Sequence, residues 1–208
     1  MMKIYGRASS SNVQKVTWCC DELGIGFERI DMGREFGGNR EAPYLAMNPN
    51  GTIPTIVEDD GFVLWESNAI LRYLAKRHGP PGFYPGHPKR AAIAEQWMDW
   101  QLNSLNVAFT PMFHGLVRQK PEERDMDAVN RSIADTQRHL AMLDRHLQGS
   151  AFVAGDAFSV ADIPVGIYAW RWHAFEGIAR TPLPAFERWY GELQKRPAFR
   201  ARVMVPMV

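Results

Sequence analysis

A proline- and glycine-rich break divides this sequence into two parts of different character. The run Gly79-Pro80-Pro81-Gly82 is followed almost at once by Tyr84-Pro85-Gly86-His87-Pro88. Proline fixes φ and lacks an N–H group, so regular helices and strands seldom continue through such a segment. We therefore predict two domains, residues 1–78 and 89–208, joined by a linker at residues 79–88.

The first part begins with the pattern of a β-α-β unit. Residues 2–6 and 27–31 alternate apolar and polar side chains, as half-buried strands do. Apolar residues between them follow helical spacing: Val13, Val16, Cys20 and Leu23. Residues 32–50 are rich in Gly, Asn and Pro and predict a loop with room for one helical turn.

A hairpin and a further helix complete the first part. The apolar runs 55–58 and 62–65 flank Asp59-Asp60-Gly61, a strong turn signal. A helical pattern follows over residues 67–78. The order β-α-β-(loop)-β-β-α predicts an α/β layer with a mixed sheet.

Beyond the linker the strand signals vanish. Apolar positions at helical spacing predict helices over residues 89–118, 125–147, 159–176 and 184–195. Ser159 and Asp162 have the spacing of a capping box at the start of the third helix, with Phe158 and Ile163 available as a hydrophobic staple. The fold class is therefore α/β followed by an all-α domain.

Composition excludes several classes of function. The chain has 208 residues, 46% of them apolar, and a formal net charge of +1, so it lacks the basic character typical of nucleic-acid binding. No apolar run approaches the roughly 18 residues of a membrane span, and residues 1–7 lack a secretory signal pattern. The two cysteines, Cys19 and Cys20, are adjacent and have no zinc-site spacing. We expect a cytoplasmic protein without a metal, a nucleic-acid partner or a membrane partner.

A cluster of hydroxyl residues stands where the first strand gives way to the first helix. Ser9, Ser10, Ser11 and Asn12 precede the helix in RASSSNVQKV, so one of them is expected to be its N-cap. A neighbouring hydroxyl is also able to donate a hydrogen bond to a thiolate, which lowers the thiol pKa. No His or Asp pattern nearby favours a hydrolytic triad.

Two further stretches have a capping or edge-strand interpretation and a binding interpretation. Pro54 directly precedes an apolar strand, where a trans edge proline is the ordinary case. A cis Ile53–Pro54 bond would instead turn the Ile53 N–H and C=O outward toward an extended peptide-like ligand. Glu66 and Ser67 stand at a helix N-terminus, where they either cap the helix or hold the ammonium and carboxylate of an amino-acid head group.

Together these stretches resemble the cytosolic glutathione S-transferase family over essentially the whole chain. The matches are SSSNVQKV near residue 10, NGTIP at 50–54, WESNAI at 65–70 and FSVADI at 158–163. The serine-type members, similar to the theta, zeta and delta classes and their bacterial relatives, fit best. The resemblance implies a thioredoxin-like N-terminal domain, a helical C-terminal domain, and glutathione as the co-substrate.

The resemblance also assigns roles to residues. Ser10 would activate the glutathione thiol, with Ser11 and Asn12 as the alternatives. Ile53, before a cis Pro54, would pair with the cysteinyl backbone, and Glu66 and Ser67 would hold the γ-glutamyl head group. Gly51 stands where many relatives have Lys or His near the glycine end of glutathione, so Arg40, Asn39 or Gln14 would have to serve there.

The second substrate would lie between the domains, against the first long helix of the second part. The residues expected to line that site are Phe109, Met112, Phe113, His114 and Arg118, with Trp170 and Trp172 as further candidates. An apolar aromatic site favours a hydrophobic electrophile, although aromatics at helical spacing also serve as core. His114 and Arg118 have a plain alternative as solvated surface residues.

The predicted function is a detoxifying glutathione transferase that conjugates glutathione to a hydrophobic electrophile. Relatives are usually homodimers, and the edge near residues 62–77 is a plausible contact. One alternative is a glutathione-dependent isomerase or dehalogenase on the same fold. The other is a non-catalytic glutathione-binding or regulatory protein.

Overall fold

The computed structural model describes residues 1–207 and divides into two compact units. One unit comprises Met1–Tyr84 together with Pro197–Val205, and the other is built around Pro85–Arg196. The division after Tyr84 falls within residues 79–88. The limits of the two domains as drawn from the sequence stay a prediction.

The first unit is built on a mixed four-stranded sheet in the order β2-β1-β3-β4. Its strands are β1 (Met2–Tyr5), β2 (Phe27–Ile30), β3 (Thr55–Val57) and β4 (Val63–Trp65). β1 is parallel to β2 because a helix returns the chain between them, whereas β3 is antiparallel to both β1 and β4. The predicted thioredoxin-like order of elements is confirmed.

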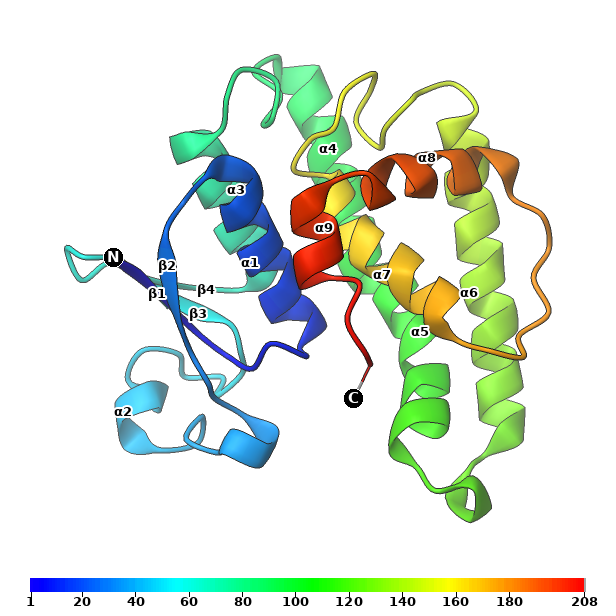
Figure 1. Ribbon diagram of the computed structural model, residues 1–208, viewed down its shortest axis with the longest axis horizontal. Helices are drawn as coiled ribbons and strands as arrows, with labels where there is room; N and C mark the ends of the chain where they lie inside the picture. Colours follow the sequence, from blue (N-terminus) through cyan, green and yellow to red (C-terminus); the bar gives the residue numbers. More distant parts are fainter. Residues whose placement is uncertain (208) are drawn as a thin grey trace. The chain divides into compact units, whose positions relative to one another are not determined.

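Helices α1 (Ser11–Leu23) and α3 (Ser67–His78) lie side by side on one face of this sheet (Figure 1). Their inward residues and those of the strands form a solvent-free core: Val13, Val16, Ile70, Leu71, Leu74, Ile4 and Ile56. Tyr5, next to Ile4, points to the opposite face because side chains alternate along a strand. There its ring lies 6.2 Å from that of the buried Tyr44. Tyr44 belongs to α2 (Ala42–Leu45), which follows the 3₁₀ turn η1 (Arg34–Phe36) within the predicted loop.

A short C-terminal helix, α9 (Pro197–Arg202), belongs to the first unit rather than to the helical one. Phe199 packs against Trp18 with ring centroids 4.8 Å apart. Arg202 Nε donates to Asp21 Oδ2 at 2.6 Å. The sequence analysis predicted no helix here, because six residues are too few to show a helical period.

The predicted helix over residues 89–118 is a succession of four helical segments. They are α4 (Pro88–Trp100), η2 (Gln101–Leu105), α5 (Asn106–Phe113) and η3 (His114–Arg118). Both η2 and η3 have π-type hydrogen bonding. Pro111 lies inside α5 and contributes no N–H. A π-helical turn is wider than an α-helical turn, and it keeps a helix continuous where the regular α-helical hydrogen-bond pattern is interrupted.

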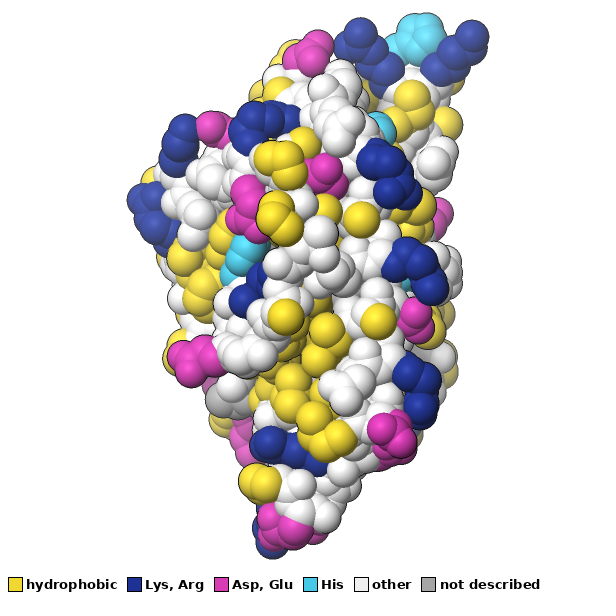
Figure 2. Space-filling model, turned by 90° about the vertical axis from the view of Figure 1, so that its right-hand side faces the viewer, with side chains coloured by type: hydrophobic (Ala, Val, Ile, Leu, Met, Phe, Trp, Pro, Cys, Tyr) yellow, Lys and Arg dark blue, Asp and Glu magenta, His cyan; other side chains and the backbone are white. Residues whose placement is uncertain are grey.

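The rest of the helical unit packs around α6 (Met126–Leu147), which contacts α5 and α8. The other elements are η4 (Pro121–Glu123), α7 (Asp162–Ala174) and α8 (Pro184–Gln194). No helix within residues 1–207 has both the length and the apolar character needed to cross a bilayer. Figure 2 shows basic and acidic side chains interspersed on one face, in line with the net charge of +1.

Only one half of the predicted capping box forms, and α7 begins three residues later than the sequence indicated. The Ser159 N–H donates to Asp162 Oδ2 at 2.8 Å, while Ser159 Oγ accepts from Ala161 rather than from Asp162. The α-helix therefore starts at Asp162 itself. Asp162 Oδ1 also accepts from the Val153 N–H at 2.9 Å and from Trp189 Nε1 at 2.8 Å. This carboxylate thus joins three separate segments of the helical unit.

Candidate functional site

The strand register brings the three polar stretches of the first unit to one end of the sheet. Tyr5 at the end of β1 pairs with Thr55 at the start of β3, which pairs with Trp65 at the end of β4. The segment after Tyr5 holds the serine cluster, the segment before Thr55 holds Ile53 and Pro54, and the segment after Trp65 holds Glu66 and Ser67. All three leave the sheet at the same edge.

Ser10 is the N-cap residue of α1, but its side chain makes no capping hydrogen bond. Its backbone is extended, with φ −75° and ψ 125°, and the Ser10 carbonyl accepts from the Gln14 N–H at 2.8 Å. Ser10 as a whole is 9% exposed, so it is buried but not completely closed off from solvent. A hydroxyl that is not used for capping is available to a ligand. Ser11, the first residue of the helix, is half-buried.

Ser67 connects the start of α3 to α1 through side-chain hydrogen bonds. Ser67 Oγ donates to Asn12 Oδ1 at 3.2 Å and accepts from Lys15 Nζ at 3.4 Å. Lys15 Nζ also donates to Asn68 Oδ1 at 3.3 Å, and the whole Lys15 side chain is buried. The structure therefore brings together Asn12 and Ser67, which sequence reasoning placed in separate roles. Lys15 was missed, because nothing in a sequence marks which lysine of a helix turns inward.

The Ile53–Pro54 peptide bond is cis, as the resemblance implies. Pro54 is buried and Ile53 is half-buried. Ile53 makes no backbone hydrogen bond within residues 1–207, so its N–H and C=O are available to an extended ligand. The preceding Thr52 carbonyl is held by the Asn48 side chain at 2.9 Å and by the Tyr44 hydroxyl at 2.5 Å. These two hydrogen bonds to Thr52 fix the position of the loop that leads to Ile53.

Glu66 has an unusual backbone for a residue that is not glycine, with φ at +69°. A side chain in this region costs about 1–3 kcal/mol, and such positions cluster at functional sites. Glu66 is exposed, whereas Ser67 directly after it is buried. The pair therefore presents an exposed carboxylate next to the free N–H groups at the start of α3.

Gly51 cannot be replaced by the Lys or His of many relatives without a rearrangement. Its φ is +60°, and a Cβ there would lie 2.9 Å from the Asn39 carbonyl oxygen and 2.8 Å from Arg40 Nη1. The Asn39 side chain donates to the Gly51 carbonyl at 2.7 Å, and Arg40 Nη1 donates to the Asn50 carbonyl at 3.1 Å. Arg40 therefore lies next to Gly51, the position at which the family resemblance predicted a basic residue that this sequence lacks.

The residues predicted to contact the second substrate all lie in the helical unit, with different exposures. Phe109, Met112 and Phe113 are buried, whereas His114 and Arg118 are exposed. Met112 is fully closed off from solvent in this conformation. The guanidinium groups of Arg118 and Arg171 each lie 5.0 Å from the Phe113 ring centroid. Contact of these residues with a substrate stays a prediction.

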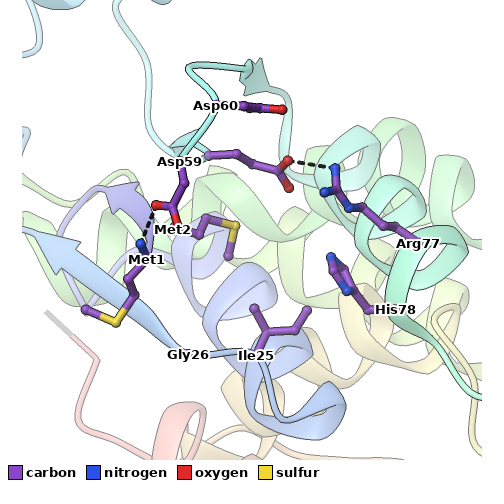
Figure 3. A pocket seen from close by; sticks show the side chains of 9 residues that line it. Met1, Met2, Ile25, Gly26, Asp59, Asp60, Arg77 and His78 are labelled. Carbon is purple, nitrogen blue, oxygen red and sulfur yellow. Dashed lines mark hydrogen bonds and ion pairs between the residues drawn. The ribbon is translucent and has the colours of Figure 1, made fainter.

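A pocket of about 330 Å³ in the first unit lies at the opposite end of the sheet from these stretches. Figure 3 shows its apolar floor and its charged rim, where Glu58 pairs with Arg77. It is lined by Met1, Met2, Ile25, Gly26, Glu58, Asp59, Asp60, Arg77 and His78. It contains none of the predicted site residues.

Neither cysteine is suited to be a nucleophile. Cys19 and Cys20 are free and buried. Burial raises the pKa of Cys19 well above its ordinary value and that of Cys20 to about 12. Within residues 1–207 no group of three or more His, Cys, Asp and Glu side chains is arranged to hold a metal ion. Any thiolate chemistry at this site therefore uses a sulfur brought by a ligand.

Comparison with known proteins supplies the family. The family model described as the glutathione S-transferase N-terminal domain matches residues 9–77, and the one for the C-terminal domain matches residues 103–197. Glutathione S-transferase GstB of Escherichia coli is 42% identical over 208 residues, covering both chains completely. The chain belongs to the glutathione S-transferase family. Its activity is accordingly glutathione S-transferase activity, and it is an enzyme.

Solved structures agree with this assignment. A theta-class glutathione S-transferase from Xanthomonas axonopodis pv. citri, crystallised with glutathione bound, superimposes with a TM-score of 0.94 at 38% identity. The match covers all of this chain and 99% of that one. Glutathione S-transferase F13 of Arabidopsis thaliana is 30% identical over 95% of this chain and 93% of its own length. The predicted resemblance to the family is confirmed.

Proposed function

We propose that this glutathione S-transferase binds glutathione at the end of the sheet where β1, β3 and β4 meet their loops. The cysteinyl part pairs with the Ile53 backbone beside cis Pro54. The γ-glutamyl head group lies at Glu66 and Ser67. The sulfur then faces the serine cluster, and Ser10 donates a hydrogen bond to the thiolate, with Ser11 and Asn12 as the alternatives.

The observation that carries this proposal is that the Ser10 hydroxyl and the Ile53 backbone groups have no hydrogen-bond partner among the described residues. The Ser10 hydroxyl makes no capping bond, and the Ile53 backbone groups have no partner within residues 1–207. Asn12 Oδ1, in contrast, already accepts from Ser67. The free Ser10 hydroxyl is therefore the donor that we favour, and Asn12 stays an alternative donor through its side-chain NH2 group.

The hydroxyl contributes by stabilising the charged form of the thiol. A free thiol has a pKa of about 8.5, so only a few per cent is ionised near neutral pH. One unit of depression corresponds to about 1.4 kcal/mol, within reach of one good charge-assisted hydrogen bond. The thiolate is then directed at an electrophile bound next to it, so reaction of two bound partners adds to the rate.

The glycine carboxylate of glutathione lies at Arg40 in this proposal. Arg40 is exposed, and its Nη1 atom lies next to Gly51, the position at which the family resemblance leads us to expect a basic residue. Asn39 is already bound to the Gly51 carbonyl, and Gln14 is 4% exposed, so both are less accessible. A guanidinium is well suited to a carboxylate because its planar donors match both oxygens.

The helical unit supplies apolar contacts to the electrophile. The apolar residues of α5 proposed for these contacts are Phe109, Met112 and Phe113, all three buried in this conformation, and the exposed His114 and Arg118 follow on η3. An apolar lining favours a hydrophobic electrophile. No metal or bound prosthetic group takes part in this proposal.

Substitution of Ser10 by Ala tests the proposal. We expect the pKa of bound glutathione, measured from the ultraviolet absorbance of the thiolate, to rise by about one unit and kcat/KM for an aryl halide to fall about tenfold. Ser104→Ala, a serine of η2 in the other unit, is the control. If Ser10→Ala changes neither quantity, Ser10 is not the donor, and Ser11→Ala followed by Asn12→Ala identifies the residue that is.

We also propose a cytoplasmic homodimer. β4 is an edge strand of the sheet, and the adjacent Phe62 is 43% exposed with its ring 5.2 Å from that of Tyr73. An exposed phenylalanine that packs on a half-buried tyrosine beside an edge strand is suited to an interface. Light scattering after size-exclusion chromatography should give twice the chain mass for the native protein and less for Phe62→Ser. The two buried free cysteines suit a reducing compartment.

A further inference from the structure

Arg7 has a side chain without a partner in the first unit. Its guanidinium makes no hydrogen bond or ion pair within residues 1–207, and its Nε atom is buried. Leaving a buried N–H group unpaired costs about 1–3 kcal/mol. The two Nη groups also have no acceptor and, unlike Nε, are not closed off from solvent, so a ligand atom is able to accept from them.

Contacts place Arg7 beside the proposed glutathione site. The Arg7 carbonyl accepts from the Ser10 N–H at 3.2 Å, so the two residues close one turn. Gly33 lies against both Arg7 and Ile53: a Cβ at Gly33 would be 3.5 Å from Arg7 Nη1 and 3.4 Å from Ile53 Cδ1. The backbone of Arg7 is therefore joined to Ser10, the residue proposed to face the sulfur, while its guanidinium lies close to Ile53, the residue proposed to pair with the cysteinyl backbone.

Arg7 and Arg34 together outnumber the one carboxylate that acts on the pKa of Arg7. Burial lowers the pKa of Arg7 first and the charge of Arg34 lowers it further, while Glu35 opposes the shift. Arg34 is exposed, and it too has no ion pair within the part of the chain that the structure describes. The nearby Asp31 is already paired with Arg29. Electrostatically, Arg7 thus interacts with one further guanidinium, that of Arg34, and with one carboxylate, that of Glu35.

We propose that Arg7 binds a carboxylate of the electrophile, so that this enzyme favours acidic electrophiles. The inference rests on the proposed function, which puts the glutathione sulfur beside Ser10. In the proposed function the thiolate of glutathione has Ser10 as its partner, and its two carboxylates have theirs at Ser67 and at Arg40. The remaining anion near the sulfur is then one carried by the second substrate, and a guanidinium binds a carboxylate through two parallel hydrogen bonds.

A matched pair of electrophiles isolates the contribution of the carboxylate. In 4-chloro-3,5-dinitrobenzoate the thiolate sulfur attacks the ring carbon that carries chlorine, and a C–S bond forms. The C–Cl bond breaks, and chloride leaves with its electron pair, while the carboxylate is unchanged. The neutral 4-chloro-3,5-dinitrobenzamide undergoes the same reaction and differs only in charge.

The first experiment measures kcat/KM of the full chain for both electrophiles, each divided by its uncatalysed rate constant with glutathione. We expect the native enzyme to favour the benzoate, and Arg7→Met to lower the benzoate-to-benzamide ratio by about tenfold or more. Arg7→Lys should retain part of the ratio, and Arg131→Met, an exposed arginine of α6, should leave it unchanged. An equal loss with both electrophiles in Arg7→Met, or no preference in the native enzyme, overturns the inference.

A binding measurement separates this inference from the proposed function. 3,5-Dinitrobenzoate has no leaving group, so its affinity is measured by calorimetry in the presence of S-methylglutathione without any turnover. We expect Arg7→Met to weaken its binding about tenfold. If the anion binds through Arg7 but neither electrophile is conjugated, the proposed function fails and this site stands. If Arg7→Met leaves the anion affinity unchanged, this site is wrong even where conjugation proceeds.

Discussion

Lys15 Nζ lies 3.4 Å from Ser67 Oγ and so joins the middle of α1 to the first residue of α3. The two residues are 52 positions apart, and both are buried. Ser67 Oγ in turn donates a hydrogen bond to Asn12 Oδ1 at 3.2 Å. The residue proposed to hold the head group of glutathione is therefore oriented by a lysine that does not itself need to touch the ligand.

Replacement of Lys15 by Met should weaken glutathione binding. Ser67 and Asn68 each lose a donor, and one hydrogen bond of about 1 kcal/mol corresponds to roughly a fivefold rise in KM for glutathione. Because Lys15 acts through Ser67, we expect KM to change more than kcat, and Lys15→Arg to restore part of the affinity. Steady-state kinetics checks this, with the exposed Lys89→Met as control. A uniform loss of active enzyme with unchanged KM would make Lys15 purely structural.

Substitution of Gly51 by Ala should destabilise the first unit. A side chain at φ +60° costs about 1 kcal/mol, and the added Cβ would lie 2.9 Å from the backbone oxygen of Asn39. Urea unfolding should therefore show a lower midpoint, and KM for glutathione should rise if Arg40 is displaced. Gly86→Ala is the matched control, since nothing lies within 4 Å of a Cβ there. Equal stability of the two variants would contradict the close packing at Gly51.

Asp162 should be the most sensitive carboxylate of the helical unit. Burial raises the pKa of Asp162, and four hydrogen bonds, from Val153, Trp189 and the two donors of Ser159, act against that rise. Asp162→Ala leaves these buried donors unpaired, which should cost more than about 3 kcal/mol of unfolding free energy. Asp156→Ala, an exposed aspartate six residues earlier, serves as the control. Thermal unfolding of both variants measures the difference, and a small effect at Asp162 would show that the donors find other partners.

The protein should lose stability as pH falls from about 6.5 to about 4, in part because of His173. Burial, aided by the charge of Arg180, lowers the pKa of His173 to about 4. The unfolded chain then binds a proton in this window that the folded chain does not, so protonation favours unfolding, and the contribution is complete below the folded pKa. His173 stacks on Tyr190 at 4.3 Å, and the carboxylate of Glu187 lies 3.4 Å from its Nε2.

His173→Phe tests this origin while keeping the stacked ring. The slope of unfolding free energy against pH between 6.5 and 4 should become shallower than in the native protein, whereas His78→Phe, at an exposed position, should leave it unchanged. An unaltered slope in His173→Phe would assign the acid sensitivity to other groups.

Local patterns in the sequence determined the elements of this protein and the residues of the proposed glutathione site. The alternation along residues 2–6 and 27–31, the Asp59-Asp60-Gly61 turn and the helical spacing beyond residue 88 each depend on nearby residues, so they can be recognised in the sequence alone. The motifs around Ser10, Pro54 and Ser67 likewise lie within short stretches, and they carried the family resemblance.

Tertiary structure alone decided which distant residues meet. The pairing of Tyr5, Thr55 and Trp65 brings three loops to one edge of the sheet, and the packing of α3 on α1 turns Lys15 inward against Ser67. The attachment of α9 to α1 through Phe199 and the unpartnered guanidinium of Arg7 were equally invisible in the sequence. The burial and the hydrogen-bond partners of these residues depend on contacts between segments far apart in the chain. The periodicity of a single helix or strand does not specify which other segment it will contact.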